Sequence, residues 1–243
     1  MWTMNIYKVF YVVAHAIFTI FETIYGTTNH FYDKLFLKEL LPFKGYYLPS
    51  DSNIPVKKPK HITVLLGLEE PDIKDLAKLI FWCITTQISF ISFYDYKGNL
   101  KKHEQDLQYE VSLYRHKDHH IVWHSNPKTV HKNGFVGKTT HVKILTDFEG
   151  KGSVVNLTKQ IVSSRSKVDI SVCTVNETLL KLFEFPDPDM GIVCGKTFRF
   201  FNYPPWQIRL TEFFRLETIQ GIRFPQFSKL LRKFSKCEQR LGK

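Results

Sequence analysis

The sequence predicts an α/β domain built on a parallel β-sheet and preceded by an apolar N-terminal segment. From His61 onward, short apolar runs of strand length alternate with longer stretches of helical periodicity, which is typical of a parallel sheet with covering helices. Residues 4–25 are strongly apolar, and residues 42–60 contain four prolines, too many for regular structure. We therefore divide the chain into a membrane segment (1–30), a juxtamembrane linker (31–60) and an α/β domain (61–243).

The N-terminal segment has the length of one membrane span. Residues 4–25 supply about 20 predominantly apolar positions, the number that a bilayer requires, and no small-residue cleavage site follows them. Downstream cations outnumber the single Lys8 upstream; they are Lys34, Lys38, Lys44, Lys57, Lys58 and Lys60. The positive-inside rule then puts the following domain in the cytosol. The alternative is an amphipathic helix that lies on the membrane or packs on the domain.

The elements of the domain follow from apolar spacing. Six apolar runs are predicted as strands: His61–Leu66, Ile88–Tyr94, Val142–Leu145, Val168–Val172, Met190–Cys194 and Thr211–Leu216. Apolar residues three and four apart predict helices that begin near Pro71, Leu100 and Ser153, a short helix over Glu177–Phe183, and a terminal helix from Phe224. Repeated strand–helix units of this kind indicate one parallel sheet.

Residues 115–140 interrupt this alternation. The segment is basic and rich in histidine, and we predict an insertion loop. His116 and His120 have the spacing of a metal-binding pair on a helix, but no glutamate or cysteine accompanies them. No metal site is therefore predicted there.

The chain is strongly basic. Its formal net charge is +11 at pH 7 and its isoelectric point is near 9.4, which favours nucleic acid, anionic lipid or phosphorylated substrates as partners. No zinc-finger spacing, aromatic RNA-binding motif or arginine block accompanies the charge. Nucleic acid is therefore excluded in favour of a phosphorylated lipid or a membrane surface.

The four cysteines lie far apart in the sequence, and three of them sit within apolar patterns. Reduced, buried thiols of a cytosolic domain are expected. Asn156 and Asn176 begin two matches to the glycosylation acceptor pattern. In a cytosolic domain both are chance matches.

The chain ends on an amphipathic helix and a short polar tail. Phe227, Leu230 and Phe234 recur at helical spacing, and the last four residues read Arg-Leu-Gly-Lys. Arg240 has a guanidinium that can hold a phosphate through two hydrogen bonds, and the backbone of Gly242 can approach a ligand closely. The alternative is a glycine C-cap followed by solvated cations.

Three segments carry a resemblance to a known family. They are HITVLLGLEEP at 61–71, PWQIRLTEF at 205–213 and CEQRLGK at the C-terminus. Together they are similar to the Nogo-B receptor family, the non-catalytic subunits of the heteromeric cis-prenyltransferase dehydrodolichyl diphosphate synthase. The resemblance runs from His61 to the end and is weak between Tyr114 and Thr140. It implies the parallel-sheet fold of undecaprenyl diphosphate synthase.

The first catalytic motif of the related enzymes is lost. Those enzymes carry His-x-x-x-x-Met-Asp-Gly-Asn-Gly-Arg-Trp, whose aspartate holds magnesium. Here His61 matches the first position, but Gly67 stands at the aspartate position and Leu-Glu-Glu-Pro follows. Two carboxylates and a proline do not favour a diphosphate, which needs free N–H groups and cations. We expect Glu69 and Glu70 to cap the next helix instead.

The second catalytic motif is half kept. Counting back from Trp206, Arg199 and Asn202 match the enzymes, whereas the expected glutamate falls on Thr197 and the first arginine on Val193. Arg199 and Asn202 are therefore candidate phosphate contacts. A solvated arginine and a turn asparagine are the equally weighted alternative.

The resemblance implies a function in trans. Arg240 and Gly242 would enter the active site of a catalytic cis-prenyltransferase partner and bind isopentenyl diphosphate there, while the partner holds Mg²⁺ and this chain holds no metal. The predicted interface residues are Trp206, Ile208, Arg209, Glu212, Phe213 and Phe234. The product would be a polyprenyl diphosphate, the precursor of the dolichol used in protein glycosylation, made at the endoplasmic reticulum membrane. The alternatives are a membrane receptor or scaffold with no role in prenyl transfer, and a divergent cis-prenyltransferase that works alone.

Overall fold

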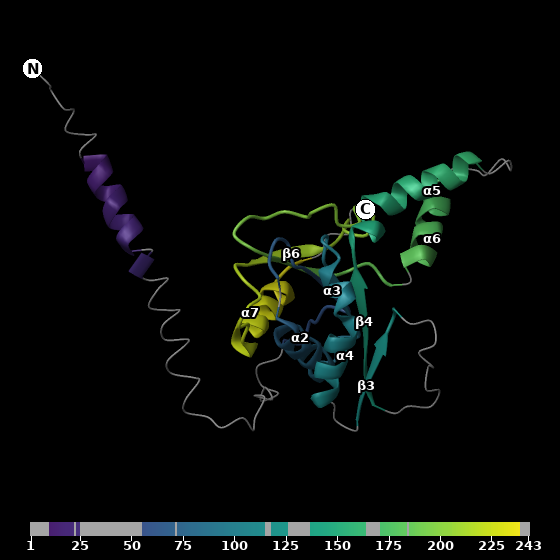
Figure 1. Cartoon of the computed structure of the whole chain (residues 1–243), viewed down its shortest axis with the longest axis horizontal. Coiled ribbons are helices and arrows are strands. Elements are labelled where there is room, and N and C mark those ends of the chain that lie inside the picture. Colours follow the sequence, from purple (N-terminus) through teal and green to yellow (C-terminus); the bar gives the residue numbers. More distant parts are fainter. Residues whose placement is uncertain are drawn as a thin grey trace, which may run out of the picture. The chain divides into compact units, whose positions relative to one another are not determined.

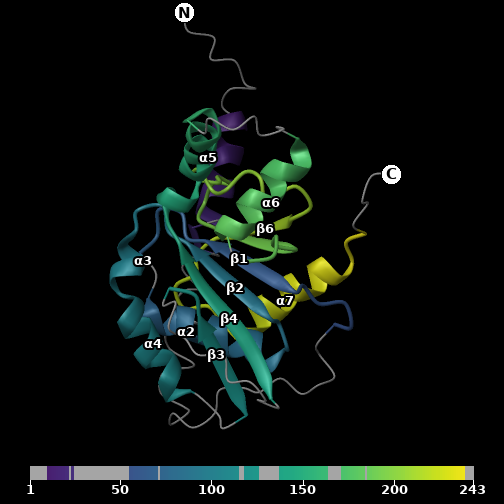
Figure 2. The same ribbon diagram turned by 90° about the vertical axis from the view of Figure 1, so that its right-hand side faces the viewer.

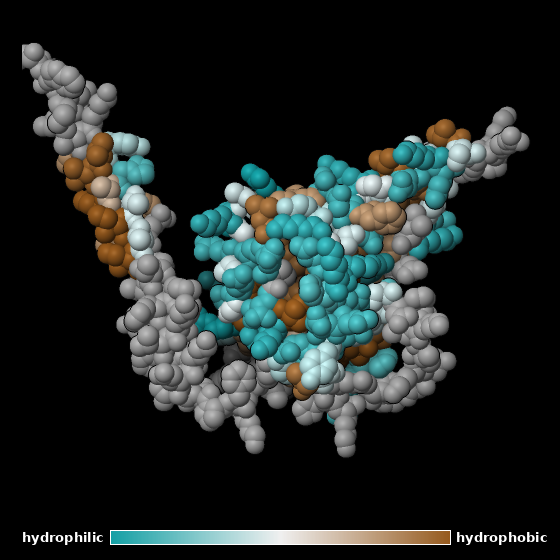
Figure 3. All heavy atoms as spheres, in the orientation of Figure 1, coloured by the Kyte–Doolittle hydropathy of each residue, from teal (hydrophilic) through white to brown (hydrophobic). Residues whose placement is uncertain are grey.

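The computed structural model describes residues 10–21, 23–24, 55–70, 72–114, 118–125, 137–163, 171–183 and 185–238. The chain separates into two compact units, Met1–Leu48 and Pro49–Lys243. In the first unit residues 10–21 form a helix (Figure 1). Its large apolar side chains are exposed and appear brown in Figure 3. Within the described parts of the chain, no helix combines the length and the apolar character needed to cross a bilayer.

The second unit is built on a six-stranded sheet in the order β3-β4-β2-β1-β5-β6 (Figure 2). The strands are β1 (His61–Leu65), β2 (Phe90–Tyr94), β3 (His119–Trp123), β4 (Lys138–Leu145), β5 (Met190–Cys194) and β6 (Glu212–Leu216). All five pairings are parallel. The central strand β1 is buried along its whole length, as expected of a parallel sheet covered on both faces.

Helices and turns connect the strands. They are α2 (Ile73–Thr85), α3 (Asn99–Lys102), α4 (Glu104–Leu113), the 3₁₀ turn η2 (Asp147–Glu149), α5 (Lys151–Ser163), α6 (Val172–Phe183) and α7 (Phe224–Ser235). Figure 1 shows α2, α4 and α7 together beside the sheet. Helices α5 and α6 lie next to each other, away from these three helices. One face of the sheet is therefore covered by helices.

Helix α7 closes the core on that face. Its side chains Phe227, Leu231 and Phe234 are almost completely buried, and the Phe227 ring lies 5.7 Å from the ring of Trp82 in α2. Phe234 is therefore part of the core of this chain. Pro225 stands in the first turn, where its missing N–H costs nothing.

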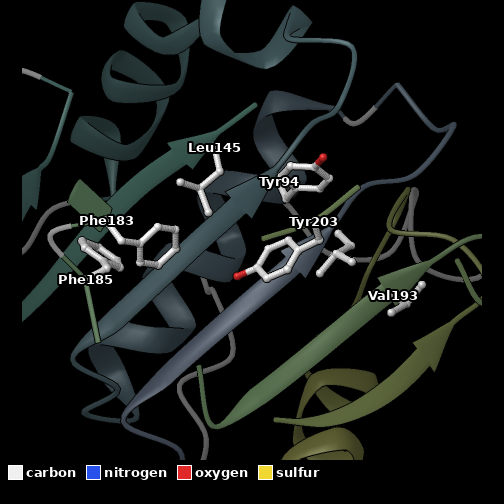
Figure 4. Packing of buried hydrophobic residues seen from close by; sticks show 7 residues of the cluster. Tyr94, Leu145, Phe183, Phe185, Val193 and Tyr203 are labelled. Carbon is white, nitrogen blue, oxygen red and sulfur yellow. The ribbon is translucent and has the colours of Figure 1, made fainter. Parts of the chain in front are cut away.

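An aromatic core covers the other face. It comprises Leu65, Tyr94, Leu145, Phe183, Phe185, Val193 and Tyr203 (Figure 4). Its aromatic rings come from β2 (Tyr94), the end of α6 (Phe183), the residues between α6 and β5 (Phe185) and the loop after β5 (Tyr203). Phe213 packs over Gly191 so closely that a Cβ at that position would overlap its ring. Strands β5 and β6 therefore pack closely against each other at this position.

Most of the predicted elements are confirmed, and two predictions are wrong. Strand β3 lies inside the segment predicted as an insertion loop. His119 is buried against Phe81 with ring centres 5.8 Å apart, so a histidine occupies an apolar strand position. Val172, predicted to end a strand, instead begins α6, and residues 168–170 lie outside the described residues. The terminal helix ends at Ser235.

His61 gives the fold a dependence on pH. Its side chain is fully buried, with Nδ1 2.6 Å from the Pro186 carbonyl oxygen and Nε2 2.9 Å from the Ser92 hydroxyl. Nδ1 can donate and Nε2 can accept only in the neutral ring. Burial lowers the pKa of His61 to about 4, whereas the unfolded value is near 6.5. The unfolded state therefore takes up the proton first as the pH falls.

We expect this histidine to reduce stability in mild acid. Its contribution is complete above about pH 6.5 and declines toward pH 4, with a loss of about 2 kcal/mol at pH 5. Urea unfolding of the wild type and of His61→Asn at pH 7 and pH 5 measures this contribution. The wild type should lose more stability than the variant by that amount, and an equal loss in both would contradict the assignment.

Candidate functional site

The carboxyl ends of the central strands are the place where parallel α/β folds build their sites. Strand β1 ends at Leu65, and the chain turns at Gly67 with a φ of +63°. A Cβ on Gly67 would lie 2.9 Å from the carbonyl oxygen of Cys194 and 3.2 Å from the Phe201 ring. The turn conformation and these two neighbours leave no room for a side chain at this position.

The loop after β5 closes the space above Gly67. Phe201 stacks on Tyr96 with ring centres 4.9 Å apart and an interplanar angle of 15°. The Tyr94 hydroxyl donates to the Phe201 carbonyl at 2.5 Å, and Phe201 and Asn202 both have positive φ values. Two consecutive residues in this conformation are costly and persist only where the surroundings hold them. The aromatic cover is therefore fixed in place.

Asn202 and Arg199, the two candidate phosphate contacts of the second motif, differ in whether this chain engages their side chains in hydrogen bonds. The side-chain amide of Asn202 donates to the Asp147 carboxylate at 3.3 Å, and the backbone carbonyl of Asn202 accepts from Lys151 N at 3.2 Å. Asn202 thus joins the β5 loop to η2 and the start of α5. Arg199 is exposed, and its guanidinium makes no hydrogen bond to a described residue. The Asn202 side chain is thus engaged within the chain, whereas the described residues provide no hydrogen-bond partner for the Arg199 guanidinium.

Glu69 and Glu70 do not cap α2, contrary to the prediction. The cap is Asp72, whose carboxylate accepts from Lys74 N at 2.8 Å. The Glu69 carboxylate instead accepts from Ile219 N at 2.9 Å and from the Thr218 hydroxyl at 3.1 Å. Glu69 therefore fastens the loop between β6 and α7 to the end of β1.

Replacing Glu69 should loosen that loop. We expect Glu69→Ala to lower the free energy of unfolding by about 1–2 kcal/mol, because the Ile219 N–H loses a charged acceptor in a half-buried position. Glu70→Ala is the matched control: the side chain is exposed, so it should change stability by less than about 0.5 kcal/mol. Urea unfolding measures both, and equal effects would contradict the assigned role.

The strand ends offer little to a magnesium ion. Octahedral Mg²⁺ prefers carboxylate oxygens and water. Gly67 occupies the sequence position that corresponds to the aspartate of the enzymes, so no carboxylate is present there. The carboxylate of Glu69 already accepts a hydrogen bond from the backbone of the loop between β6 and α7. Within the described residues no group of three or more potential ligand side chains comes together. The residues present do not fit the magnesium site of the enzymes.

The predicted interface segment packs beside α6. The indole of Trp206 donates to the Asn176 side chain at 3.1 Å, while Ile208 and Phe213 are half-buried against the aromatic core. The side chain of Asn176 is thus engaged in a hydrogen bond. Trp206, Ile208 and Phe213 are held by this chain but are not fully covered by it.

The charged members of the segment sit at its edge. Arg209 is exposed and Glu212 half-buried, and neither forms a salt bridge with a described residue. Burial raises the pKa of Asp187, and the guanidinium of Arg209 partly offsets this rise. Arg209 is therefore close enough to influence Asp187 while it remains accessible to a partner.

The helices α5 and α6 expose apolar side chains that the sequence did not single out. Val155, Val162 and Val172 are more than half exposed, as is Phe148 of η2, and Figure 3 shows brown surface on this part of the molecule. A cavity of about 190 Å³ between η2, α5 and α6 is lined by the apolar side chains of Phe148, Leu157, Leu179 and Phe183 together with five polar residues, Glu149, Ser153, Asn156, Gln160 and Gln207. Several exposed apolar side chains on neighbouring elements are typical of an interaction site.

Known proteins with similar sequences identify the family. The dehydrodolichyl diphosphate synthase complex subunit Nus1 of Mus musculus is 32% identical over 202 residues, which cover 77% of this chain and 67% of the mouse protein. The chain belongs to the NUS1 family of complex subunits. The Homo sapiens subunit is 30% identical over 199 residues, 77% of this chain and 68% of the human protein. No protein-family profile matches the sequence.

Solved structures agree with NUS1 membership at the level of the fold. Lavandulyl diphosphate synthase from Lavandula x intermedia superposes with a TM-score of 0.53 and 14% identity, over 76% of this chain and 99% of that chain. A probable undecaprenyl diphosphate synthase from Campylobacter jejuni gives 0.50 and 16%, over 77% and 100%. The predicted undecaprenyl diphosphate synthase-like sheet is thus confirmed.

The remaining predicted site residues of this NUS1 chain are Arg240 and Gly242, which lie outside the described residues. The described chain continues past α7 to Glu238. There the Lys57 ammonium donates to the Cys237 carbonyl oxygen. This contact ties the end of α7 to the residues that precede β1.

Proposed function

We propose that this chain is the non-catalytic subunit of a dehydrodolichyl diphosphate synthase complex. It pairs with a catalytic cis-prenyltransferase and supplies Arg240 and Gly242 to the partner's active site. The closed turn at Gly67 carries the proposal: at the place where the enzymes hold magnesium, this chain has no side chain and no space for one. A fold kept without its own metal site is retained for what its surface binds.

The apolar side chains of α5 and α6 support a partner surface. Together with Trp206, which is bonded to α6 through Asn176, they form a surface of exposed valines beside an aromatic anchor. Buried aromatic anchors dominate the energetics of protein interfaces. We assign this surface to the catalytic subunit, with Arg209 and Glu212 at its rim.

Charges placed on this surface should prevent assembly. Val155 and Val162 are exposed, so Val155→Asp/Val162→Asp leaves the core intact, but an unpaired carboxylate buried at an interface costs several kcal/mol. We expect the variant to lose co-purification with the catalytic subunit and to keep its unfolding midpoint. Tyr109→Asp/Leu113→Asp, at two exposed positions of α4, is the matched control and should still co-purify. Full co-purification of the double variant would contradict this surface.

In this proposal the C-terminal tail contributes a positive charge that binds the diphosphate of the substrate. The Arg240 guanidinium would hold the diphosphate of isopentenyl diphosphate through two hydrogen bonds, and Gly242 would let the backbone approach it closely. Mg²⁺ would be held by the catalytic partner, because the strand ends of this chain do not fit it. The product would be the polyprenyl diphosphate that precedes the dolichol carrier of protein glycosylation.

We also propose that the protein acts at the endoplasmic reticulum membrane with the α/β domain in the cytosol. The exposed apolar side chains of residues 10–21 support membrane association. All four cysteines are free, which is compatible with a reducing compartment.

Reconstitution tests the proposed function. The purified chain, a catalytic cis-prenyltransferase subunit and their co-purified complex are each given magnesium, farnesyl diphosphate and labelled isopentenyl diphosphate. We expect this chain alone to be inactive and the complex to elongate faster than the partner alone. Chain elongation by this protein alone, or a partner whose rate is unchanged by it, would refute the proposal.

A further inference from the structure

The outer face of α7 is a row of cations. Lys229, Arg232 and Lys233 of α7 and its C-cap residue Lys236 are spaced three and four residues apart, and all four are exposed. This spacing places them on one side of a helix. The opposite side, with Phe227 and Phe234, is buried in the core. The helix thus presents its whole charged side to the surroundings.

These cations have no carboxylate partners among the described residues. Helix α7 contains no acidic residue, and none of its four exposed cations joins a salt bridge of the described chain. Lys57 adds a further exposed cation at the C-terminal end of α7. Its ammonium bonds to the Cys237 carbonyl and lies 5.3 Å from the centre of the Phe234 ring, so it flanks the row rather than lying within it. The neighbouring Val56 is fully exposed.

The chemistry of this face fits an anionic bilayer. Uncompensated cations on a surface attract the headgroups of anionic phospholipids, and an apolar side chain beside them can enter the headgroup layer. The same chain carries a helix at residues 10–21 with exposed apolar side chains. We propose that the outer face of α7, extended by Lys57 and Val56, binds the anionic phospholipid surface of a membrane.

The proposal does not depend on prenyl transfer or on the catalytic subunit. It concerns the side of the domain that faces lipid, and the tail residues Arg240 and Gly242 play no part in it. Each cation close to such a surface strengthens binding roughly fivefold. Four of them therefore decide whether α7 lies on the bilayer or away from it.

A fluorophore on Cys237 reports the position of α7. In the complete chain, Cys83 and Cys194 are buried and Cys173 is exposed, so Cys173→Ser leaves Cys237 as the accessible thiol. The labelled chain is reconstituted into phosphatidylcholine vesicles with and without phosphatidylserine, each containing a headgroup-linked nitroxide quencher. We expect strong quenching with phosphatidylserine, weak quenching without it, and a loss of the difference at high salt, which screens surface charge.

Two matched variants decide the outcome. Lys229→Gln/Arg232→Gln/Lys233→Gln/Lys236→Gln should lower docking several-hundredfold on the same scale and reduce quenching to the level of neutral vesicles. The control replaces four other exposed lysines, Lys102, Lys151, Lys159 and Lys196, by glutamine and should quench like the wild type. Circular dichroism verifies that both variants fold, and the double variant Lys229→Gln/Lys233→Gln provides an intermediate step.

Three results would overturn the proposal. Equal quenching in neutral and anionic vesicles would show that the docking of α7 does not depend on lipid charge. Equal losses in the two quadruple variants would assign the effect to net charge alone. Binding of single-stranded RNA that the α7 substitutions abolish, with vesicle quenching unchanged, would assign the face to nucleic acid.

Discussion

Replacing Arg240 by alanine in the assembled complex should lower kcat/KM for isopentenyl diphosphate by roughly 30- to 1,000-fold. The loss corresponds to about 2–4 kcal/mol, the range for a charged donor that contacts the developing charge of a transition state. We expect the effect to arise in the partner's active site, so the substitution should leave the stability of this chain unchanged. Single-turnover elongation of the purified complex measures it.

Two further tail variants show whether the guanidinium itself is required. Arg240→Lys keeps the charge but lacks the planar pair of donors, so it should recover only part of the rate. Lys243→Ala removes a neighbouring charge and should have little effect. If all three variants elongate like the wild type while the complex remains intact, the tail has no role in phosphate binding.

Restoring the aspartate of the enzymes at position 67 should damage the fold rather than create a metal site. Gly67 has a φ of +63°, and a Cβ would meet the Cys194 carbonyl at 2.9 Å and the Phe201 ring at 3.2 Å. Backbone strain and overpacking each cost about 1–3 kcal/mol. We expect Gly67→Asp to lose about 2–4 kcal/mol of unfolding free energy and to show no elongation activity by itself.

The neighbouring Leu68 provides the control. Its side chain is 61% exposed, so Leu68→Asp introduces the same carboxylate one residue away with little change in stability. Urea unfolding of both variants, with and without magnesium, makes the comparison. A Gly67→Asp variant as stable as the wild type, or stabilised by magnesium, would contradict the closed turn.

Local sequence patterns were sufficient for the strands that are buried along their whole length. Strands β1 and β5 are of this kind, and runs that are mostly apolar mark them, although β1 also contains His61 and Thr63. Strand β3 was missed because His119 and His120 read as polar, although His119 packs against Phe81. An imidazole ring can occupy a buried strand position, which polarity alone does not reveal.

Within the candidate site, the sequence allowed a prediction only for features that depend on the identity of a single residue. The motif comparison identified Gly67 as the lost aspartate position. The cover over it was not predicted, because it requires Phe201 and Tyr96 from distant loops to stack. In the same way, the bond from Glu69 to Ile219 joins residues 150 positions apart. Contacts over such sequence distances leave no periodic signal.

The most direct measurement is a structure of the complex with an unreactive analogue of isopentenyl diphosphate. We predict that the guanidinium of Arg240 lies within hydrogen-bond distance of the analogue's diphosphate, in the active site of the catalytic subunit. A diphosphate bound above Gly67 of this chain, or a tail directed away from the partner's site, would contradict the proposed role of this subunit.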